Sequence, residues 1–229
     1  MKAYERFVKY VTVRTPRDDS SSTVPSSMCQ FDLAKVLEAE MKELGLVDVE
    51  TDDMCYLYGK LPATPGLEDK PAIGFIAHMD TVADFVEDEI VPVLHENYNG
   101  ESFELGNSGR ILSTEVFPHL KDLKGRTLIT TNGNTILGAD DKAGIAEILT
   151  VMETVIKENI PHGPLCVAFT PDEEIGTGAA HFNVERFGAD FAYTMDGEIE
   201  GEIQYESFNA AKAVFDITGF SVHPGTSKD

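Results

Sequence analysis

A mostly apolar segment in the first half of the chain ends in two side chains that could do chemistry together. In GFIAHMDTVADF, residues 74–85, four mostly apolar residues lead directly into His78 and Asp80. An imidazole can bind a metal ion, and a nearby carboxylate can bind the same ion or hold the ring by a hydrogen bond. A His-x-Asp pair alone is more often a polar turn, so its meaning depends on what other segments contribute.

Carboxylates mark the ends of other segments in the same way. Glu173 and Glu174 follow one apolar run, Asp196 follows another, and Asp140 opens a helical pattern. Each alone is explained by a loop, a turn or a helix cap. Ligands in α/β sheets gather at the carboxyl ends of strands, so we expect these side chains to converge. Converging carboxylates repel one another, and cations between them relieve that repulsion.

The expected set of ligand atoms points to hydrolytic chemistry. One imidazole with several carboxylate oxygens suits zinc, manganese or cobalt better than copper. Successive residues of an extended segment point to opposite sides, so one of Glu173 and Glu174 can bind metal while the other faces a substrate. A carboxylate beside a metal ion can accept a proton from an attacking water. The residues therefore predict a hydrolytic metal site, with the number of ions left open.

The elements that must position this site alternate between strands and amphipathic helices. Asp140 or Asp141 stands where a helix N-cap belongs, and Gly45 is a plausible end for an earlier helix. We expect strands at residues 55–61, 73–77, 165–169 and 191–195, and helices over residues 33–44 and 145–156. This order predicts an α/β fold, a three-layer sandwich with a mainly parallel or mixed central sheet.

Two segments depart from this order. Residues 84–128 are acidic and irregular, and so long a connection is more often functional or an insertion than neutral filler. Near the end of the chain, Val214, Asp216 and Thr218 alternate with apolar residues, which predicts a half-buried strand. We expect this strand to begin a different domain.

Composition and charge exclude several classes of partner. The chain has 18 Lys and Arg residues against 40 Asp and Glu residues, a net charge of −22. Such a field repels nucleic acids and anionic membranes, so we expect neither as a partner. The 3 cysteines are far apart, which argues against a disulfide framework or a thiolate zinc site and fits a reducing compartment. Without a signal peptide or a long apolar run, we expect a soluble, cytoplasmic protein.

The motifs, in their order along the chain, resemble those of the dizinc exopeptidase and deacylase superfamily. The matching segments are AHMDTV (77–82), TTNGNTILGADDKAGIAEI (130–148), FTPDEEIGTGA (169–179), TMDG (194–197) and SVHPG (221–225). The insertion at 84–128 resembles the peptidase T family of cytoplasmic aminotripeptidases in particular. This resemblance implies a zinc-dependent aminopeptidase that releases the N-terminal residue from tripeptides, with two zinc ions in a complete catalytic domain.

The resemblance also implies which residues hold the metals. His78 would bind the first zinc, and Asp80 would hold its ring. Asp196 would complete that first site, and Asp140 would bind both ions. Glu174 would bind the second zinc, whose remaining histidine ligand comes in the family from a later segment. We therefore expect a complete ligand set for one zinc and an incomplete set for the other.

Two further residues would act on the substrate. Glu173 would be the general base for the attacking water, and His223 of SVHPG resembles the histidine that stabilises the developing oxyanion. The remaining histidines lie in no matching motif and are expected to be surface or structural: His95, His119, His162 and His181.

The resemblance also extends to domains and partners. Residues 1–207 would form a zinc-peptidase domain that lacks its C-terminal part, and residues 208–229 would begin a truncated α+β lid and dimerisation domain. In the full-length protein this lid would support a homodimer. The 229-residue chain is therefore expected to have little or no peptidase activity.

Two alternatives stay open. A deacylase of N-acyl amino acids, a dipeptidase or a carboxypeptidase of the same superfamily would share the same metal chemistry. A non-catalytic metal-binding protein on the same fold is the alternative from another class. Its mark would be the loss of the base at position 173, and Glu173 is present.

Overall fold

The computed structural model describes residues 1–85, 89–197, 199–206, 209–211 and 213–219. The chain divides into two compact units, Met1–Asp196 and Gly197–Asp229. All the helices and strands of the described residues lie in the first unit. The assignment of residues 1–207 and 208–229 to separate domains stays a prediction.

The first unit contains one main sheet of five strands in the order β1-β2-β8-β3-β9. Its strands are β1 (Val47–Thr51), β2 (Leu57–Leu61), β3 (Ile73–His78), β8 (Leu165–Thr170) and β9 (Phe191–Thr194). The strands β8, β3 and β9 are parallel, while β2 runs antiparallel to β8 and β1 antiparallel to β2. The predicted α/β fold with a mixed sheet is confirmed, and four of its strands lie where the sequence predicts them.

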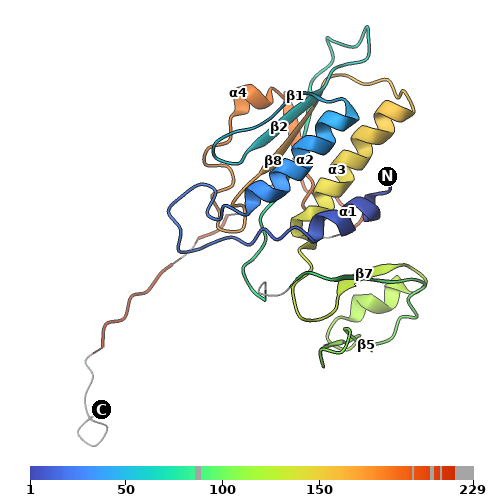
Figure 1. Ribbon diagram of the computed structural model, residues 1–229, viewed down its shortest axis with the longest axis vertical. Helices are drawn as coiled ribbons and strands as arrows, with labels where there is room; N and C mark the ends of the chain where they lie inside the picture. Colours follow the sequence, from blue (N-terminus) through green and yellow to red (C-terminus); the bar gives the residue numbers. More distant parts are fainter. Residues whose placement is uncertain (86–88, 198, 207–208, 212, 220–229) are drawn as a thin grey trace, which may run out of the picture. The chain divides into compact units, whose positions relative to one another are not determined.

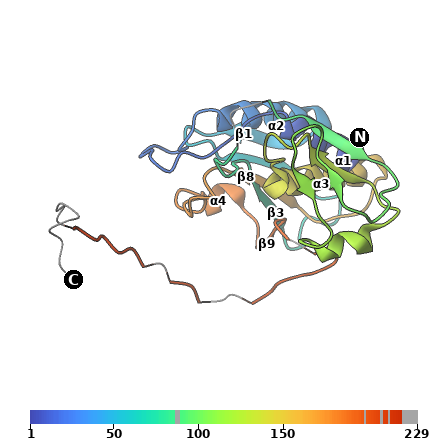
Figure 2. The ribbon, with the colours of Figure 1, turned by 90° about the horizontal axis from the view of Figure 1, so that it is seen from below.

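Helices cover the sheet unequally on its two faces. The helices are α1 (Ala3–Val11), α2 (Gln30–Leu44), α3 (Ala139–Lys157) and the short α4 (Val184–Phe187). Figures 1 and 2 show α1, α2 and α3 on one face of the sheet and α4 on the other. Alternate residues of β8 face these two layers. Leu165, Val167 and Phe169 join the core beneath the three long helices, while Cys166 and Ala168 pack on the side of α4.

Helix ends follow from local residue types. The helix α2 ends at Leu44, and Gly45 then adopts φ 91°, a left-handed conformation that glycine takes without strain. At the start of α3, Asp140 and Asp141 have non-helical backbone angles, and the peptide bond between them is cis. The Oδ1 atom of Asp141 accepts a hydrogen bond from the N–H of Gly144 at 3.2 Å, so Asp141 has the capping role expected for one of this pair.

The insertion contains ordered elements, contrary to the expectation of an irregular connection. They are β4 (Pro92–His95), β5 (Phe103–Glu104), β6 (Ile111–Leu112), the 3₁₀ helix η1 (Pro118–Leu123) and β7 (Leu128–Thr131). The strands β4 and β7 pair antiparallel, and so do β5 and β6. The strands β5 and β6 have two residues each, too few to show an alternating pattern, which is why the sequence did not reveal these two strands. Figure 1 shows these elements beside the main sheet.

In the second unit, the described residues form neither a helix nor a strand. The half-buried strand expected around Val214, Asp216 and Thr218 is absent from residues 213–219, because no neighbouring strand in the described residues pairs with them. The predicted oxyanion residue His223 lies outside the described residues. Among those that are described, no helix is long and apolar enough to cross a membrane.

Candidate metal centre

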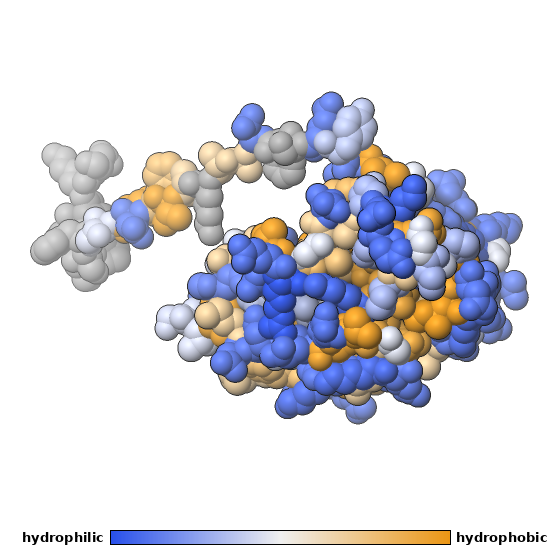
Figure 3. Space-filling view, turned by 90° about the horizontal axis from the view of Figure 1, so that it is seen from above, coloured by the Kyte–Doolittle hydropathy of each residue, from blue (hydrophilic) through white to orange (hydrophobic). Residues whose placement is uncertain are grey.

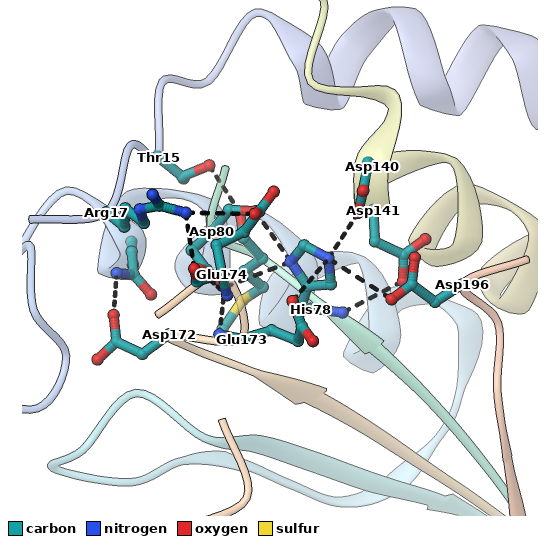
Figure 4. Close-up of polar contacts among 12 residues, drawn as sticks. Thr15, Arg17, His78, Asp80, Asp140, Asp141, Asp172, Glu173, Glu174 and Asp196 are labelled. Carbon is teal, nitrogen blue, oxygen red and sulfur yellow. Dashed lines mark hydrogen bonds and ion pairs between the residues drawn. The ribbon is translucent and has the colours of Figure 1, made fainter. Parts of the chain in front are cut away.

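The carboxyl ends of three parallel strands bring the predicted site residues together. His78, the last residue of β3, lies in register with Thr170, the last residue of β8. The strand β9 pairs with the other edge of β3, and the N–H of Met195 donates to the carbonyl of Ile76 at 2.8 Å. Residues that follow these strands therefore meet at one edge of the sheet, together with the start of α3 (Figure 4). The predicted convergence is confirmed.

His78 is the centre of this arrangement. Its side chain is 2% exposed, and Nε2 lies 2.7 Å from Oδ1 of Asp140 and 3.8 Å from Oδ2 of Asp196. The other ring nitrogen, Nδ1, lies 3.0 Å from the carbonyl oxygen of Asp80 and 3.3 Å from its Oδ1. Burial lowers the pKa of His78, but the hydrogen bond and the charge of Asp80 outweigh it, and the pKa rises to about 10. The ring thus carries a proton at Nε2, where a metal cation could replace it.

Asp80 holds more than the imidazole. Its side chain is 0% exposed, and its two oxygens accept hydrogen bonds from the N–H groups of Glu173 at 3.0 Å and Glu174 at 3.1 Å. The sequence predicts only the contact with His78. In the structure, this one carboxylate ties the end of β3 to the turn after β8.

The acidic side chains surround Nε2 of His78 in two groups. One oxygen each from Glu173 and Asp196 lies within 4.8 Å of the imidazole and of one another, and so do oxygens of Asp140 and Glu174. Burial raises the pKa of Glu173, Glu174 and Asp196, and the charges of neighbouring carboxylates raise them further. The part of these pKa shifts that comes from repulsion between converging carboxylates is the part that a cation among them would relieve.

Asp141 is buried beside the site but serves the backbone. Its Oδ2 accepts a hydrogen bond from the N–H of His78 at 3.3 Å, while Oδ1 caps α3. Burial, and then repulsion from Asp196, raises the pKa of Asp141 to about 8. Sequence patterns do not separate the tasks of Asp140 and Asp141, because both are acidic residues at a helix start.

Asp172 is a second residue whose part the sequence did not reveal. It is 1% exposed and has φ 55°, and its carboxylate accepts hydrogen bonds from the N–H and Oγ of Ser26 and from Nε2 of Gln30. Ser26 lies in the polar segment RTPRDDSSSTVPSS, residues 14–27. The turn that carries Glu173 and Glu174 is therefore anchored by a segment about 146 residues earlier.

The other described histidines lie outside this cluster. Nε2 of His95 lies 2.9 Å from Oγ1 of Thr130 between β4 and β7, and Nδ1 of His162 lies 2.7 Å from the carbonyl of Gly163. Neither His119 nor His181 belongs to the groups of side chains that could hold a metal among the described residues.

Comparisons with known proteins give consistent matches. A family model described as M42 glutamyl aminopeptidase matches residues 123–213, which include the four carboxylates around His78. A protein named peptidase T from Exiguobacterium sp. is 52% identical over 230 residues, which is 100% of this chain and 56% of that protein. A peptidase T from Clostridium perfringens is 50% identical over 228 residues, 99% of this chain and 56% of that protein. The chain thus spans little more than half the length of these relatives.

Solved structures give the same picture of the fold. A tripeptidase from Staphylococcus aureus matches with a TM-score of 0.60 and 26% identity, over 86% of this chain and 43% of that chain. The aminopeptidase PepT from Bacillus cereus matches with a TM-score of 0.60 and 27% identity, also over 86% of this chain and 43% of that chain.

Proposed function

Along its whole length this chain is a relative of the peptidase T proteins, and we propose on that premise that its fold builds the metal centre of a zinc-dependent aminopeptidase acting on tripeptides. The observation that carries the proposal is the convergence of several carboxylates on Nε2 of one buried histidine, His78. Peptidases of this chemistry need a metal ion held by nitrogen and oxygen ligands beside a carboxylate base.

The donor set fits a zinc ion. Two oxygens of Asp80 face Nδ1 of His78, so Nδ1 keeps its proton and Nε2 is the nitrogen that can bind metal. Carboxylates from separate loops supply the oxygen ligands. With one imidazole and several carboxylates, the set matches zinc better than it matches a softer ion.

Each ligand residue has a proposed task. His78, Asp140 and Asp196 would hold one ion, and Asp140 with Glu174 would contribute to a second. Asp140 suits a shared position because its side chain is 70% exposed and can reach two neighbours, whereas Glu174 is held at 17% exposure. When bound, the ions would polarise the scissile carbonyl and make the attacking water more acidic.

Glu173 would act as the general base. Its side chain is 54% exposed and stands 4.0 Å from Nε2 of His78, close enough to share a water with the metal centre. Burial raises the pKa of its carboxyl group, and the greater basicity helps it take a proton from that water and deliver it to the leaving amine. The role of His223 as an oxyanion-stabilising residue stays a prediction.

Metal content tests the site directly. Zinc bound per chain is measured by equilibrium dialysis and elemental analysis for the 229-residue protein and for Asp140→Asn. About one equivalent in the parent, lost in the variant, supports the proposal. A folded parent chain, checked by circular dichroism, that binds no zinc overturns it.

Substrate choice tests the reaction class. An aminopeptidase must recognise a free α-ammonium group, so the zinc-loaded full-length protein should release leucine from Leu-Gly-Gly faster than it cleaves N-acetyl-leucine. Preference for the blocked substrate would favour the deacylase alternative.

A further inference from the structure

One polar segment contacts all three loops that carry the proposed ligands at the ends of β3 and β8 and the start of α3. This segment, residues 13–30, is called the strap below. It runs beside the end of β3, where the N–H of Thr81 donates to the carbonyl of Thr15 at 3.0 Å and the N–H of Arg17 donates to the carbonyl of Thr81 at 2.9 Å. Figure 4 shows Thr15 and Arg17 on the side of the site opposite Asp140 and Asp196.

The strap reaches the other two loops through buried polar groups. The ammonium group of Lys142, whose residue is 0% exposed, donates to the carbonyl of Val13 at 2.6 Å. At the far end of the strap, Ser26 and Gln30 bind the carboxylate of Asp172. Because these groups are buried, each would be costly to leave without a partner. The strap therefore fixes the spacing of the loops that carry the ligands.

Arg17 is the strap residue whose side chain contacts a proposed ligand. Its Nη1 donates to the carbonyl oxygen of Glu174 at 2.6 Å and lies 3.4 Å from Oε2 of the same residue. The N–H of Glu174 is held by Asp80 at 3.1 Å. The polar main-chain groups of Glu174 are thus held from two sides, one by a buried carboxylate and the other by a guanidinium group that is 22% exposed.

We propose that Arg17 is a positioning residue for the carboxylate of Glu174, and that without it the metal centre binds its ions more weakly. The inference rests on the proposed function, since it assigns Glu174 to the metal. The shorter contact of Arg17 is to the main-chain carbonyl, which stays available when the carboxylate turns to a metal ion. Loss of this contact frees the turn, and changes of this kind beside metal ligands cost about 10- to 100-fold in affinity.

If Arg17 instead competed with the metal, its removal would change the metal affinity in the opposite direction. As a counter-ion that competes with metal for Glu174, it would weaken metal binding, and its removal would strengthen it. The structure favours positioning, because the guanidinium has a second acidic neighbour, with Nε of Arg17 3.1 Å from Oδ1 of Asp19. The contact to Oε2 of Glu174 is also the longer of the two.

Three variants of the 229-residue chain test this proposal. Arg17→Met removes the contact, Arg17→Lys keeps the charge and one donor, and Arg14→Met removes an equal charge from an exposed side chain three residues earlier. Binding of Zn²⁺ and of Co²⁺ is measured by equilibrium dialysis, and the visible spectrum of bound Co²⁺ reports the ligand geometry. Circular dichroism and thermal melting of the metal-free proteins check the fold.

Because Glu174 is assigned to the second ion, the affinities of the first and the second metal equivalent are compared separately. For the second equivalent we expect about 10- to 100-fold weaker binding and an altered Co²⁺ spectrum in Arg17→Met, partial recovery in Arg17→Lys and no change in Arg14→Met. Affinity in Arg17→Met equal to or tighter than in the parent overturns the inference. Should Arg17→Met fail to fold, the shorter and uncharged Arg17→Gln takes its place, and an unchanged Co²⁺ spectrum and affinity in that variant would also overturn the inference. A folded parent chain that binds no metal would instead contradict the proposed function.

Discussion

At the scale of single residues, Asp80 connects more of the site than any pattern in the sequence indicates. It faces Nδ1 of His78 and accepts both N–H groups of the Glu173–Glu174 turn. An aspartate is needed for this because only a carboxylate offers acceptors on both oxygens. Asp80 therefore helps to set the distance between Nε2 of His78 and the carboxylate of Glu173.

Asp80→Asn should weaken metal binding by about 10- to 100-fold and destabilise the fold by about 1–3 kcal/mol. The amide nitrogen of asparagine would face an N–H donor, leaving one of the two main-chain groups without an acceptor. Metal dialysis and urea unfolding measure the two effects. Asp69→Asn, at an exposed position, is the matched control and should change neither. Normal metal binding by Asp80→Asn would refute the role given to this carboxylate.

The variant Glu173→Gln distinguishes the general-base role of Glu173 from metal binding by the other carboxylates. Because the amide cannot accept a proton, turnover in the full-length protein should fall to background while bound zinc remains. Asp140→Asn should lose zinc as well, since it removes an oxygen 2.7 Å from Nε2 of His78. Elemental analysis and a tripeptide assay check both variants together. Retained turnover in Glu173→Gln would rule out its role as general base.

At the scale of secondary-structure elements, a buried arginine joins the three helices on one face of the sheet. Arg6 of α1 is 2% exposed and lies 2.7 Å from Oε1 of Glu40 in α2 and 2.7 Å from Oε2 of Glu153 in α3. The helix α3 carries Asp140 at its start, so its orientation matters to the metal centre. Burial raises the pKa of Glu40, but the hydrogen bonds from Lys9 and Arg6 outweigh burial and hold the pKa below its usual value.

Arg6→Met should cost about 3–5 kcal/mol of unfolding free energy at neutral pH, because Glu40 and Glu153 lose the buried cation between them and keep only partners nearer the surface. The pKa of Glu153 is lowered to about 2 by hydrogen bonds, first from Lys157. A carboxylate with a lowered pKa in the folded state stabilises the fold above its unfolded pKa, and this contribution is lost as the pH falls through the folded pKa. The parent chain should therefore lose stability between about pH 4.5 and pH 2.

The variant should lose less stability over that range, since its carboxylates no longer have an arginine partner. Urea unfolding at several pH values measures the difference, with Lys35→Met as a control that removes an exposed ion pair to Asp32. Equal acid sensitivity of Arg6→Met and the parent would show that these carboxylates do not govern acid stability.

At the scale of the whole molecule, the acidic surface and the carboxylates of the metal centre both attract cations. The net charge is −22, and Figure 3 shows hydrophilic residues over much of one face of the molecule, with apolar areas among them. Such a field raises the local concentration of cations. The repulsion among the carboxylates of the site adds to this general attraction at one place.

Zinc should consequently raise the melting temperature of the chain. A ligand at about 100 times its dissociation constant stabilises the folded state by about 2.7 kcal/mol. Thermal melting with and without zinc, followed by removal of the metal with a chelator, measures the shift. Asp140→Asn should show little of it, and an equal shift in that variant would place the bound zinc elsewhere.

The sequence predicts the positions of four of the five strands of the main sheet and the convergence of the site residues well. Both follow from local patterns, since apolar runs mark buried strands and the ligands follow those runs directly. The contact of Arg17 with Glu174 spans 157 residues, and that of Ser26 with Asp172 spans 146. No local pattern carries such information, because arginine and serine in a polar tract are compatible with any loop.

The strand β9 forms one edge of the main sheet, directly before Asp196 of the proposed metal centre. It pairs only with β3 among the described residues, and Phe191, Ala192, Tyr193 and Thr194 are all exposed. Edge strands with little burial open more readily than central ones, so fraying here would carry Asp196 away from His78 while β8 stays closed. A metal ion bound to both residues would link the end of β3 to the end of β9. The cation would then stabilise the pairing of the edge strand as well as take part in the chemistry.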